Sequence, residues 1–187
     1  MIILVKGRPV YLALPTDVAY EKISASRLST PINTEPPEND QDVEAAVIES
    51  IYRLVKDANG DVVVLIDACT IRHRVKQELK ELLDKTQFPV YATPMGKTAI
   101  DEDYPRYGGV RCKFSAHNGS ELSRFFFQVY IGSVSHPDIL EKVEGAKLII
   151  SVGSMLSDFN TGNFTYHIPR SKAVEVNELP WNIVICS

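Results

Sequence analysis

The chain has 187 residues, of which 44% are apolar and 24% charged, and its formal net charge is −4, which is typical of one soluble globular domain with its own core. Its basic residues are scattered, and no apolar run approaches the roughly 20 residues that span a bilayer, which argues against nucleic-acid and membrane partners. Three widely spaced cysteines without a CxxC pair favour a reduced, cytoplasmic setting.

The first part of the chain predicts a strand and then a linker. Arg8–Pro15 alternates large apolar residues and is closed by proline, so we expect a strand there. Residues 18–40 hold three prolines and show little periodicity. Because proline lacks an amide donor and resists helix, this stretch is typical of a crossing linker.

The middle of the chain alternates helices and strands. After Asp40, apolar residues recur at helical spacing as far as Asn59-Gly60, and we expect them on one buried face: Val43, Val47, Ile51, Leu54 and Val55. A second helix is expected at 72–85, with these residues inward: Val75, Leu79, Leu82 and Leu83. A third helix is expected at 137–143, and apolar runs predict strands at 61–67, 88–93, 148–152 and 173–176. This order predicts an α/β fold with a parallel sheet covered by helices on both faces.

One strand-to-loop junction, residues 147–162, is a candidate ligand site. An apolar run stops at Gly153 and a polar turn follows, and ligands of open α/β sheets bind at the carboxyl ends of strands. Asp158 and Asn160 could bind a cation or polar ligand there, but their residue types favour turn formation. The loop Thr93–Lys97 lacks nucleotide-loop spacing, and we expect it to pack on a neighbouring domain. The remaining histidines form no metal-ligand pattern: His117, His136 and His167.

Five blocks, in fixed order, carry a family resemblance: Gly7–Asp17, Asp67–His73, Phe88–Lys97, Pro105–Gly109 and Ser151–Gly162. Together they resemble the thiamine-diphosphate-dependent 2-oxo acid decarboxylases, most closely fungal pyruvate decarboxylase. The resemblance implies a Rossmann-like central domain at 41–176. It also implies that 1–17 is a remnant of the N-terminal pyrimidine-binding domain, that 18–40 is a linker, and that 177–187 is a tail outside the family pattern.

The same resemblance sets an expectation for function. Such enzymes decarboxylate 2-oxo acids non-oxidatively to aldehydes with thiamine diphosphate and magnesium, and the full-length enzyme is a homo-oligomer. Its activating glutamate and its metal motif belong to the other two domains, and neither is found in this sequence. We therefore expect no catalytic, cofactor-binding or metal-binding residues here, and an isolated chain that is inactive. The alternatives are a module that binds FAD or a nucleotide, a fragment that docks on full-length enzyme, and a non-functional truncated gene product.

A regulatory site is implied by three residues that follow the strand at 61–67. In the family that the chain resembles, the matching cysteine is assigned to substrate activation, and the arginine and histidine after it lie near the bound effector. The resemblance here points to Cys69, Arg72 and His73, with a 2-oxo acid such as pyruvate as the effector. An arginine suits a carboxylate, and a nearby cation and a helix start favour a thiolate. The alternative is structural: a small buried thiol, with Arg72 and His73 capping the next helix.

Residues 110–128 interrupt the family pattern. Val110 and Val129 both fit the same family valine, and the ends of the segment can be encoded by sequences that resemble the two ends of an intron. We hypothesise a retained or mis-annotated intron, the alternative being a genuine surface loop, which chain entropy tolerates well. Sequencing the transcript distinguishes the two, because a spliced message that still encodes Phe125-Phe126-Phe127 excludes the intron.

Overall fold

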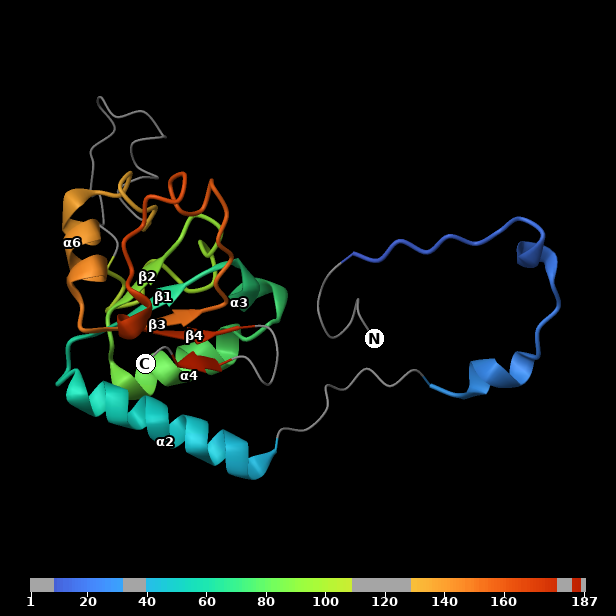
Figure 1. The fold of residues 1–187 in the computed structure, drawn as a ribbon, viewed down its shortest axis with the longest axis horizontal. Coiled ribbons are helices and arrows are strands. Elements are labelled where there is room, and N and C mark those ends of the chain that lie inside the picture. The colour runs from blue at the N-terminus through green and yellow to red at the C-terminus, as the bar shows by residue number, and fades with distance from the viewer. Residues whose placement is uncertain (1–8, 32–39, 109–128, 178–182, 186–187) are drawn as a thin grey trace. The chain divides into compact units, whose positions relative to one another are not determined.

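The computed structural model describes residues 9–31, 40–108, 129–177 and the backbone of 183–185 (Figure 1). The proposed insertion at 110–128 lies outside these residues. The chain forms two units, which divide between Glu38 and Asn39. Each unit is described by itself.

The first unit contains two short 3-10 helices, η1 (Val18–Tyr20) and η2 (Ala25–Ser29). The prediction of a strand at Arg8–Pro15 was wrong. Residues 9–15 pair with no strand in the part of the chain that the structure describes. An alternating pattern becomes a strand only when a neighbour completes its hydrogen-bond ladder. The large apolar side chains of residues 9–31 are accordingly exposed, as Tyr11 is at 93%.

The second unit is built on a five-stranded sheet in the order β2-β1-β3-β4-β5. Its strands are β1 (Val62–Ile66), β2 (Val90–Ala92), β3 (Leu148–Val152), β4 (Ala173–Val176) and β5 (Ile183–Ile185). The first four are parallel, which confirms the predicted fold class. The fifth, which lies in the tail excluded from the family pattern, pairs antiparallel with β4 and was not predicted.

Among the described residues, four α-helices accompany the sheet: α2 (Gln41–Asp57), α3 (Ala68–Arg72), α4 (Lys76–Thr86) and α6 (Pro137–Gly145). The helix expected at 72–85 corresponds to α4 but begins later, at Lys76, and α3, which ends at Arg72, was not predicted. Arg74 adopts a left-handed φ of 60° and separates α3 from α4. The predicted start after Asp40 is confirmed, since its carboxylate accepts hydrogen bonds from the amides of Asp42 and Val43.

Apolar side chains of β1 alternate between two cores. Val62, Val64 and Ile66 pack on the face covered by α2 and α4, while Val63 and Leu65 pack on the face covered by α6 (Figure 1). Two inward predictions were wrong, because Val43 and Leu82 are exposed at 54% and 38%. Val43 lies in the first turn of α2, and Leu82 lies on the outer edge of the buried stripe of α4.

Candidate functional site

Asp67 joins three loops at the carboxyl end of the sheet. It directly follows β1 and is only 3% exposed. Its Oδ1 accepts hydrogen bonds from the Ala68 amide and the Thr93 hydroxyl, both at 2.6 Å. Its Oδ2 accepts one from the Met155 amide at 2.7 Å, and the Asn160 side-chain amide donates to both oxygens. One carboxylate therefore holds the ends of β1, β2 and β3 together.

The three predicted regulatory residues lie together in α3, which Asp67 caps at its N-terminus. Cys69 is 4% exposed, and the Arg72 guanidinium Nη1 lies 3.9 Å from its sulfur. The Nη2 of Arg72 lies 3.8 Å from the Met155 sulfur, so the guanidinium spans α3 and the loop after β3. His73 ends the helix, and its amide donates to the Cys69 carbonyl at 2.9 Å. The helical spacing of i and i+3 is what brings Arg72 onto Cys69.

Gly153 lets this helix approach the sheet. Its carbonyl accepts the Cys69 amide at 3.0 Å, and its own amide donates to the Val176 carbonyl at 2.8 Å. It has a left-handed φ of 71°, and a Cβ here would overlap the backbone nitrogen of Thr70. The backbone of α3 therefore lies directly against the end of β3, and the Cys69 thiol is buried at this junction.

A cavity of about 300 Å³, here called the strand-end cavity, lies on the α6 side of the same edge. Its lining includes Tyr130, Ser151, Ser154, Arg170 and Glu175. The Ser151 and Ser154 hydroxyls are 2.6 Å apart and share a hydrogen bond. The cavity thus combines hydroxyl groups, the Arg170 cation and the carboxylates of Glu175 and Asp67 at the place where ligands of open α/β sheets bind.

Residues 48–124 match the family model described as the thiamine pyrophosphate enzyme central domain. The chain contains a thiamine pyrophosphate enzyme central domain. The matched stretch ends inside the segment 110–128, so the insertion stays a prediction.

Known relatives extend this match to most of the chain. Pyruvate decarboxylase isozyme 2 of Saccharomyces cerevisiae is 46% identical over 168 residues, which are 90% of this chain and 26% of that protein. Pyruvate decarboxylase of Kluyveromyces marxianus is 44% identical over 171 residues, 91% of this chain and 27% of that protein. Pyruvate decarboxylase of Candida albicans is 41% identical over 168 residues, 90% of this chain and 26% of that protein. The chain therefore spans about a quarter of the length of the curated relatives it matches.

Two loops of the central domain, 157–162 and 93–97, contact each other, which was not expected from the sequence. Asp158 shapes its own turn, as expected, by accepting the Phe159 amide at 2.7 Å. Asn160 is 2% exposed and does more, because its side chain binds Asp67 and accepts the Met95 amide at 3.1 Å. The loop Thr93–Lys97 therefore packs on its own sheet, and packing on a neighbouring domain stays a prediction.

The remaining histidines show no metal-binding cluster in the described part of the central domain. His136 caps α6 through Nδ1, which accepts the Asp138 amide at 3.3 Å, while His167 is exposed and His117 lies outside the described residues. Within the described ranges, no group of three or more His, Cys, Asp or Glu residues could hold a metal ion. No helix among the described residues is long and apolar enough to cross a membrane.

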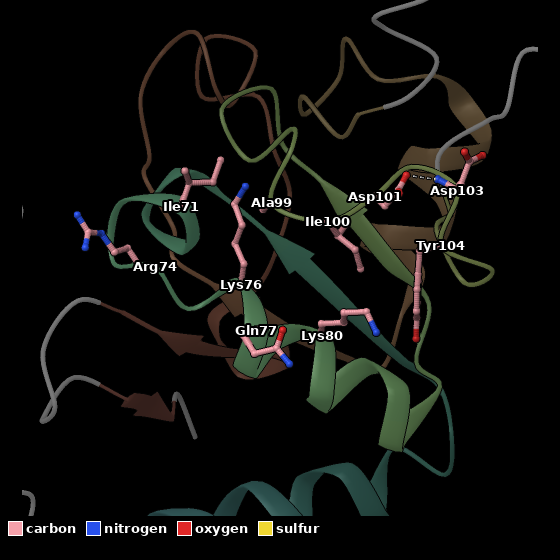
Figure 2. A pocket seen from close by; sticks show the side chains of 10 residues that line it. All are labelled: Ile71, Arg74, Lys76, Gln77, Lys80, Ala99, Ile100, Asp101, Asp103 and Tyr104. Carbon is pink, nitrogen blue, oxygen red and sulfur yellow. Dashed lines mark hydrogen bonds between the residues drawn. The ribbon is translucent and has the colours of Figure 1, made fainter.

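A larger and more open hollow of about 630 Å³ lies between α4 and residues 99–104 (Figure 2). Two of its cations already have partners. Lys76 Nζ donates to the Thr98 carbonyl at 2.6 Å, and Lys80 pairs with Asp84 at 2.6 Å. The side chain of Asp84, by hydrogen bond and by charge, raises the pKa of Lys80. We assign no ligand to this hollow.

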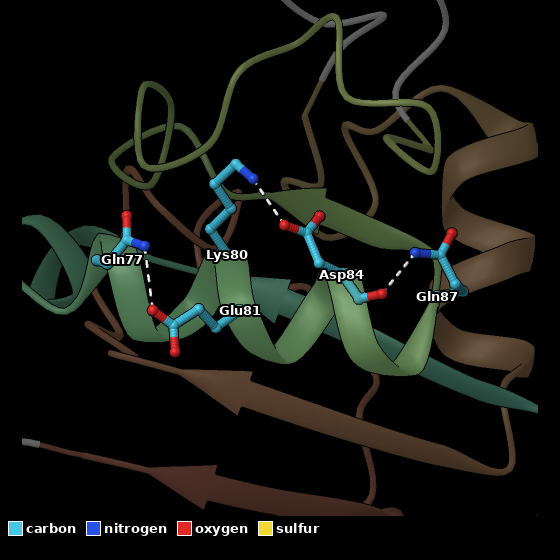
Figure 3. Close-up of polar contacts among 5 residues, drawn as sticks. All are labelled: Gln77, Lys80, Glu81, Asp84 and Gln87. Atoms are coloured by element: carbon cyan, nitrogen blue, oxygen red, sulfur yellow. Dashed lines mark hydrogen bonds and ion pairs between the residues drawn. The ribbon is translucent and has the colours of Figure 1, made fainter.

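The polar side chains of α4 and of Gln87, which follows it, form hydrogen bonds with one another and with the backbone of the same helix (Figure 3). Gln77 donates to Glu81 at 3.1 Å, and Gln87 donates to the Asp84 carbonyl at 2.8 Å. Contacts of this kind between side chains one turn apart stabilise an exposed helix by only a few tenths of a kcal/mol, about 0.2–0.5 each. The face is therefore a solvated surface of the domain.

Tyr130 gives the domain a predicted dependence on alkaline pH. Its hydroxyl donates to Glu144 at 2.7 Å, and burial, followed by this hydrogen bond and the Glu144 charge, raises the pKa of Tyr130 far above its usual value. Burial also raises the pKa of Tyr107 and Tyr91. Because the pKa of each folded-state phenol lies above that of the unfolded chain, their stabilising contribution is complete below about pH 10 and is lost as the pH rises further.

We therefore expect the free energy of unfolding to fall above about pH 10, by about 1.4 kcal/mol per pH unit for each buried tyrosine. Tyr130→Phe should lower the slope of the unfolding free energy against pH by the contribution of one tyrosine. Tyr52→Phe, at a tyrosine that is 60% exposed, provides the matched control for the loss of a hydroxyl group. Urea unfolding followed by circular dichroism from pH 8 to 11 measures all three chains. Equal slopes for Tyr130→Phe and the unmodified chain would contradict the assignment.

Sequence reasoning missed Asp67 and Glu175 as residues of this edge. Asp67 carried one usable signal, since it is an acidic residue placed directly after a wholly apolar strand. Glu175 carried another, because it interrupts the apolar strand Ala173–Val176. Apart from the adjacent Ala68, the hydrogen-bond partners of the Asp67 carboxylate lie 26 to 93 residues away in the sequence, and only the folded sheet brings them together.

Proposed function

We propose that this chain supplies the central domain of a pyruvate decarboxylase, an enzyme that converts 2-oxo acids to aldehydes without oxidation, using thiamine diphosphate and magnesium. The observation that carries the proposal is the match to pyruvate decarboxylases over 90% of the chain at up to 46% identity. The parallel sheet and its helices supply the fold that the matched residues require. We place the enzyme in the cytoplasm as a homo-oligomer.

The chain by itself is proposed to be inactive. In the decarboxylases that it resembles, thiamine diphosphate and magnesium are held by other domains, and the chain covers 26–27% of the length of the relatives named above. We therefore expect neither cofactor to bind the chain alone. Clear acetaldehyde formation from pyruvate by the purified chain, above a blank without protein, would overturn this part of the proposal.

Within the enzyme, the domain is proposed to bind a 2-oxo acid as an effector at Cys69, Arg72 and His73. The supporting geometry is the guanidinium of Arg72, which lies beside the Cys69 sulfur and can offer two parallel N–H donors to a carboxylate. Cys69 is 4% exposed, so an effector reaches the thiol only when α3 and the loop after β3 separate. The structural alternative treats Cys69 as a small apolar filler of that junction.

Alkylation of individual cysteines tests the effector role. In the intact chain, we expect pyruvate to slow the reaction of Cys69 with iodoacetamide in proportion to occupancy of the site, because binding stabilises the closed form. Peptide mapping by mass spectrometry reads each thiol separately, and Cys112 and Cys186 serve as internal references. Arg72→Gln should remove the protection. A Cys69 rate that pyruvate leaves unchanged at every concentration would favour the structural role.

The alternative of an FAD- or nucleotide-binding module is not proposed. The relatives named above are pyruvate decarboxylases, and no observation of the described residues favours a nucleotide. Docking on a full-length enzyme, and a gene product without function, stay predictions from the sequence.

A further inference from the structure

The face of the sheet that carries α6 breaks its apolar pattern at two neighbouring positions. Leu65 of β1 pairs in register with Ser151 of β3, which pairs with Glu175 of β4. The residues of inner parallel strands are normally apolar on both faces, and a carboxylate there is costly unless something compensates it. A serine and a glutamate side by side on this face therefore need an explanation.

Both side chains line the strand-end cavity. The apolar core under α6 contains residues of β1 and β3 but none of β4 among the described residues. The space over β4 is instead bounded by the loop after β3, with Leu156, Tyr166 and Ile168 in the cavity wall. The cavity holds about 300 Å³, room for about ten water molecules or a ligand of similar size.

Opposite charges line this one small space. Arg170, at the start of the short 3-10 helix Arg170–Lys172, contributes a guanidinium, and Glu175 contributes a half-buried carboxylate. Asp67 also borders the cavity, but its carboxylate already accepts five hydrogen bonds from the protein. From the part of the chain that the structure describes, the Glu175 carboxylate accepts one long hydrogen bond, of 3.4 Å from the Asn177 side-chain amide, which leaves it acceptor capacity.

We propose that the strand-end cavity binds a free α-amino acid with an apolar side chain. The ligand ammonium pairs with Glu175, and the ligand carboxylate pairs with Arg170 and the Ser151–Ser154 hydroxyl pair. Its side chain packs on Leu65 and Ile168. A molecule without an ammonium would leave the half-buried Glu175 carboxylate without a partner, and one without a carboxylate would lose the contacts with the exposed Arg170 and the two serine hydroxyls, which makes the site selective for a zwitterion. This site is separate from Cys69 and does not depend on the decarboxylase assignment.

Isothermal titration calorimetry of the full chain tests this proposal with matched ligands. Leucine carries both charges, 4-methylpentanoate lacks the ammonium, and 3-methylbutylamine lacks the carboxylate. We expect leucine or phenylalanine to bind at least about tenfold more tightly than either single-charge analogue. Absence of binding by both amino acids, or equal binding of leucine and 4-methylpentanoate, would overturn the proposal. Tighter binding of ADP, NAD or FAD that displaces leucine would also overturn it, in favour of a nucleotide site.

Two variants test which protein side chain binds each charged group of the ligand. Glu175→Gln should bring leucine down to the affinity of 4-methylpentanoate, and Arg170→Gln should bring it down to that of 3-methylbutylamine, each a loss of about tenfold or more. Arg74→Gln, in the other hollow, is the control and should leave leucine binding unchanged. Circular dichroism verifies that each variant is folded. Leucine binding that survives both substitutions in folded protein would contradict the assigned contacts.

Discussion

Replacement of Asp67 by alanine is expected to unfold the central domain or to lower its free energy of unfolding by more than about 4 kcal/mol. The substitution removes the acceptor of three donors, which are the amides of Ala68 and Met155 and the Thr93 hydroxyl. It also leaves the Asn160 side-chain amide with only the Met155 carbonyl, at 2.9 Å. Each buried donor left unsatisfied costs about 1–3 kcal/mol, and these costs are not fully additive. Typical domains have only about 5–15 kcal/mol of stability, so a loss of this size is decisive.

Urea unfolding of the variant, followed by circular dichroism, measures this loss. Asp158→Ala is the matched control, because Asp158 is an exposed aspartate of the neighbouring loop that accepts only a local amide. It should cost less than about 1 kcal/mol. The double variant Asp67→Ala/Asn160→Ala should lose less than the sum of its two single variants, since the two side chains contact each other. An Asp67→Ala chain as stable as the Asp158→Ala chain would contradict the role given to Asp67.

Gly153→Ala is expected to be at least as damaging, because steric overlap adds to backbone strain. The position has a left-handed φ of 71°, and an added Cβ would overlap the Thr70 nitrogen and lie 2.8 Å from the Cys69 carbonyl carbon. Both neighbours are backbone atoms of α3 and cannot rotate away. Strain alone costs about 1–2 kcal/mol, and moving α3 off the sheet also breaks the hydrogen bond from Cys69 to Gly153. We expect a loss of about 4 kcal/mol or more, or no folded protein.

Two other glycines separate strain from overlap. Gly60 has a similar left-handed φ of 84° but no atom within 4 Å of an added Cβ, so Gly60→Ala should cost only the strain, about 1–2 kcal/mol. Gly145 ends α6 with open space and an ordinary φ, so Gly145→Ala should be close to neutral. Thermal unfolding should give the lowest melting temperature for Gly153→Ala, an intermediate one for Gly60→Ala and the highest for Gly145→Ala. A Gly153→Ala melting temperature equal to that of Gly60→Ala would show that α3 is not packed against β3 as described.

The parts of the fold that depend on local pattern could be predicted from the sequence. Continuous apolar runs located β1 and β3 to within a residue or two, and Asp40 marked the start of α2. The break between α3 and α4 could not be predicted, because Arg74 takes its left-handed conformation without a glycine or proline to indicate it. The strand Ile183–Ile185 was missed because it pairs with β4, and that pairing depends on a sheet already formed.

The candidate site likewise has contacts that could be predicted from the sequence and contacts that could not. Cys69 and Arg72 are three residues apart on one helix, so their proximity follows from the sequence once the helix is known. Asn160 was expected to shape its own turn, yet its side chain reaches an aspartate 93 residues away. Contacts of that range are set by which strand ends share an edge of the sheet, and residue types in a single loop carry no such information.

The central claim is that residues 41–176 perform the part of a pyruvate decarboxylase central domain. It is tested most directly by a chimera in which these residues replace the matching segment of Saccharomyces cerevisiae pyruvate decarboxylase isozyme 2, to which the chain is 46% identical. The measurement is acetaldehyde formation from pyruvate with thiamine diphosphate and magnesium, with the parent enzyme as the reference. We predict that the chimera forms acetaldehyde. A chimera that folds, assembles and binds thiamine diphosphate as the parent does, yet forms no acetaldehyde, would contradict the claim.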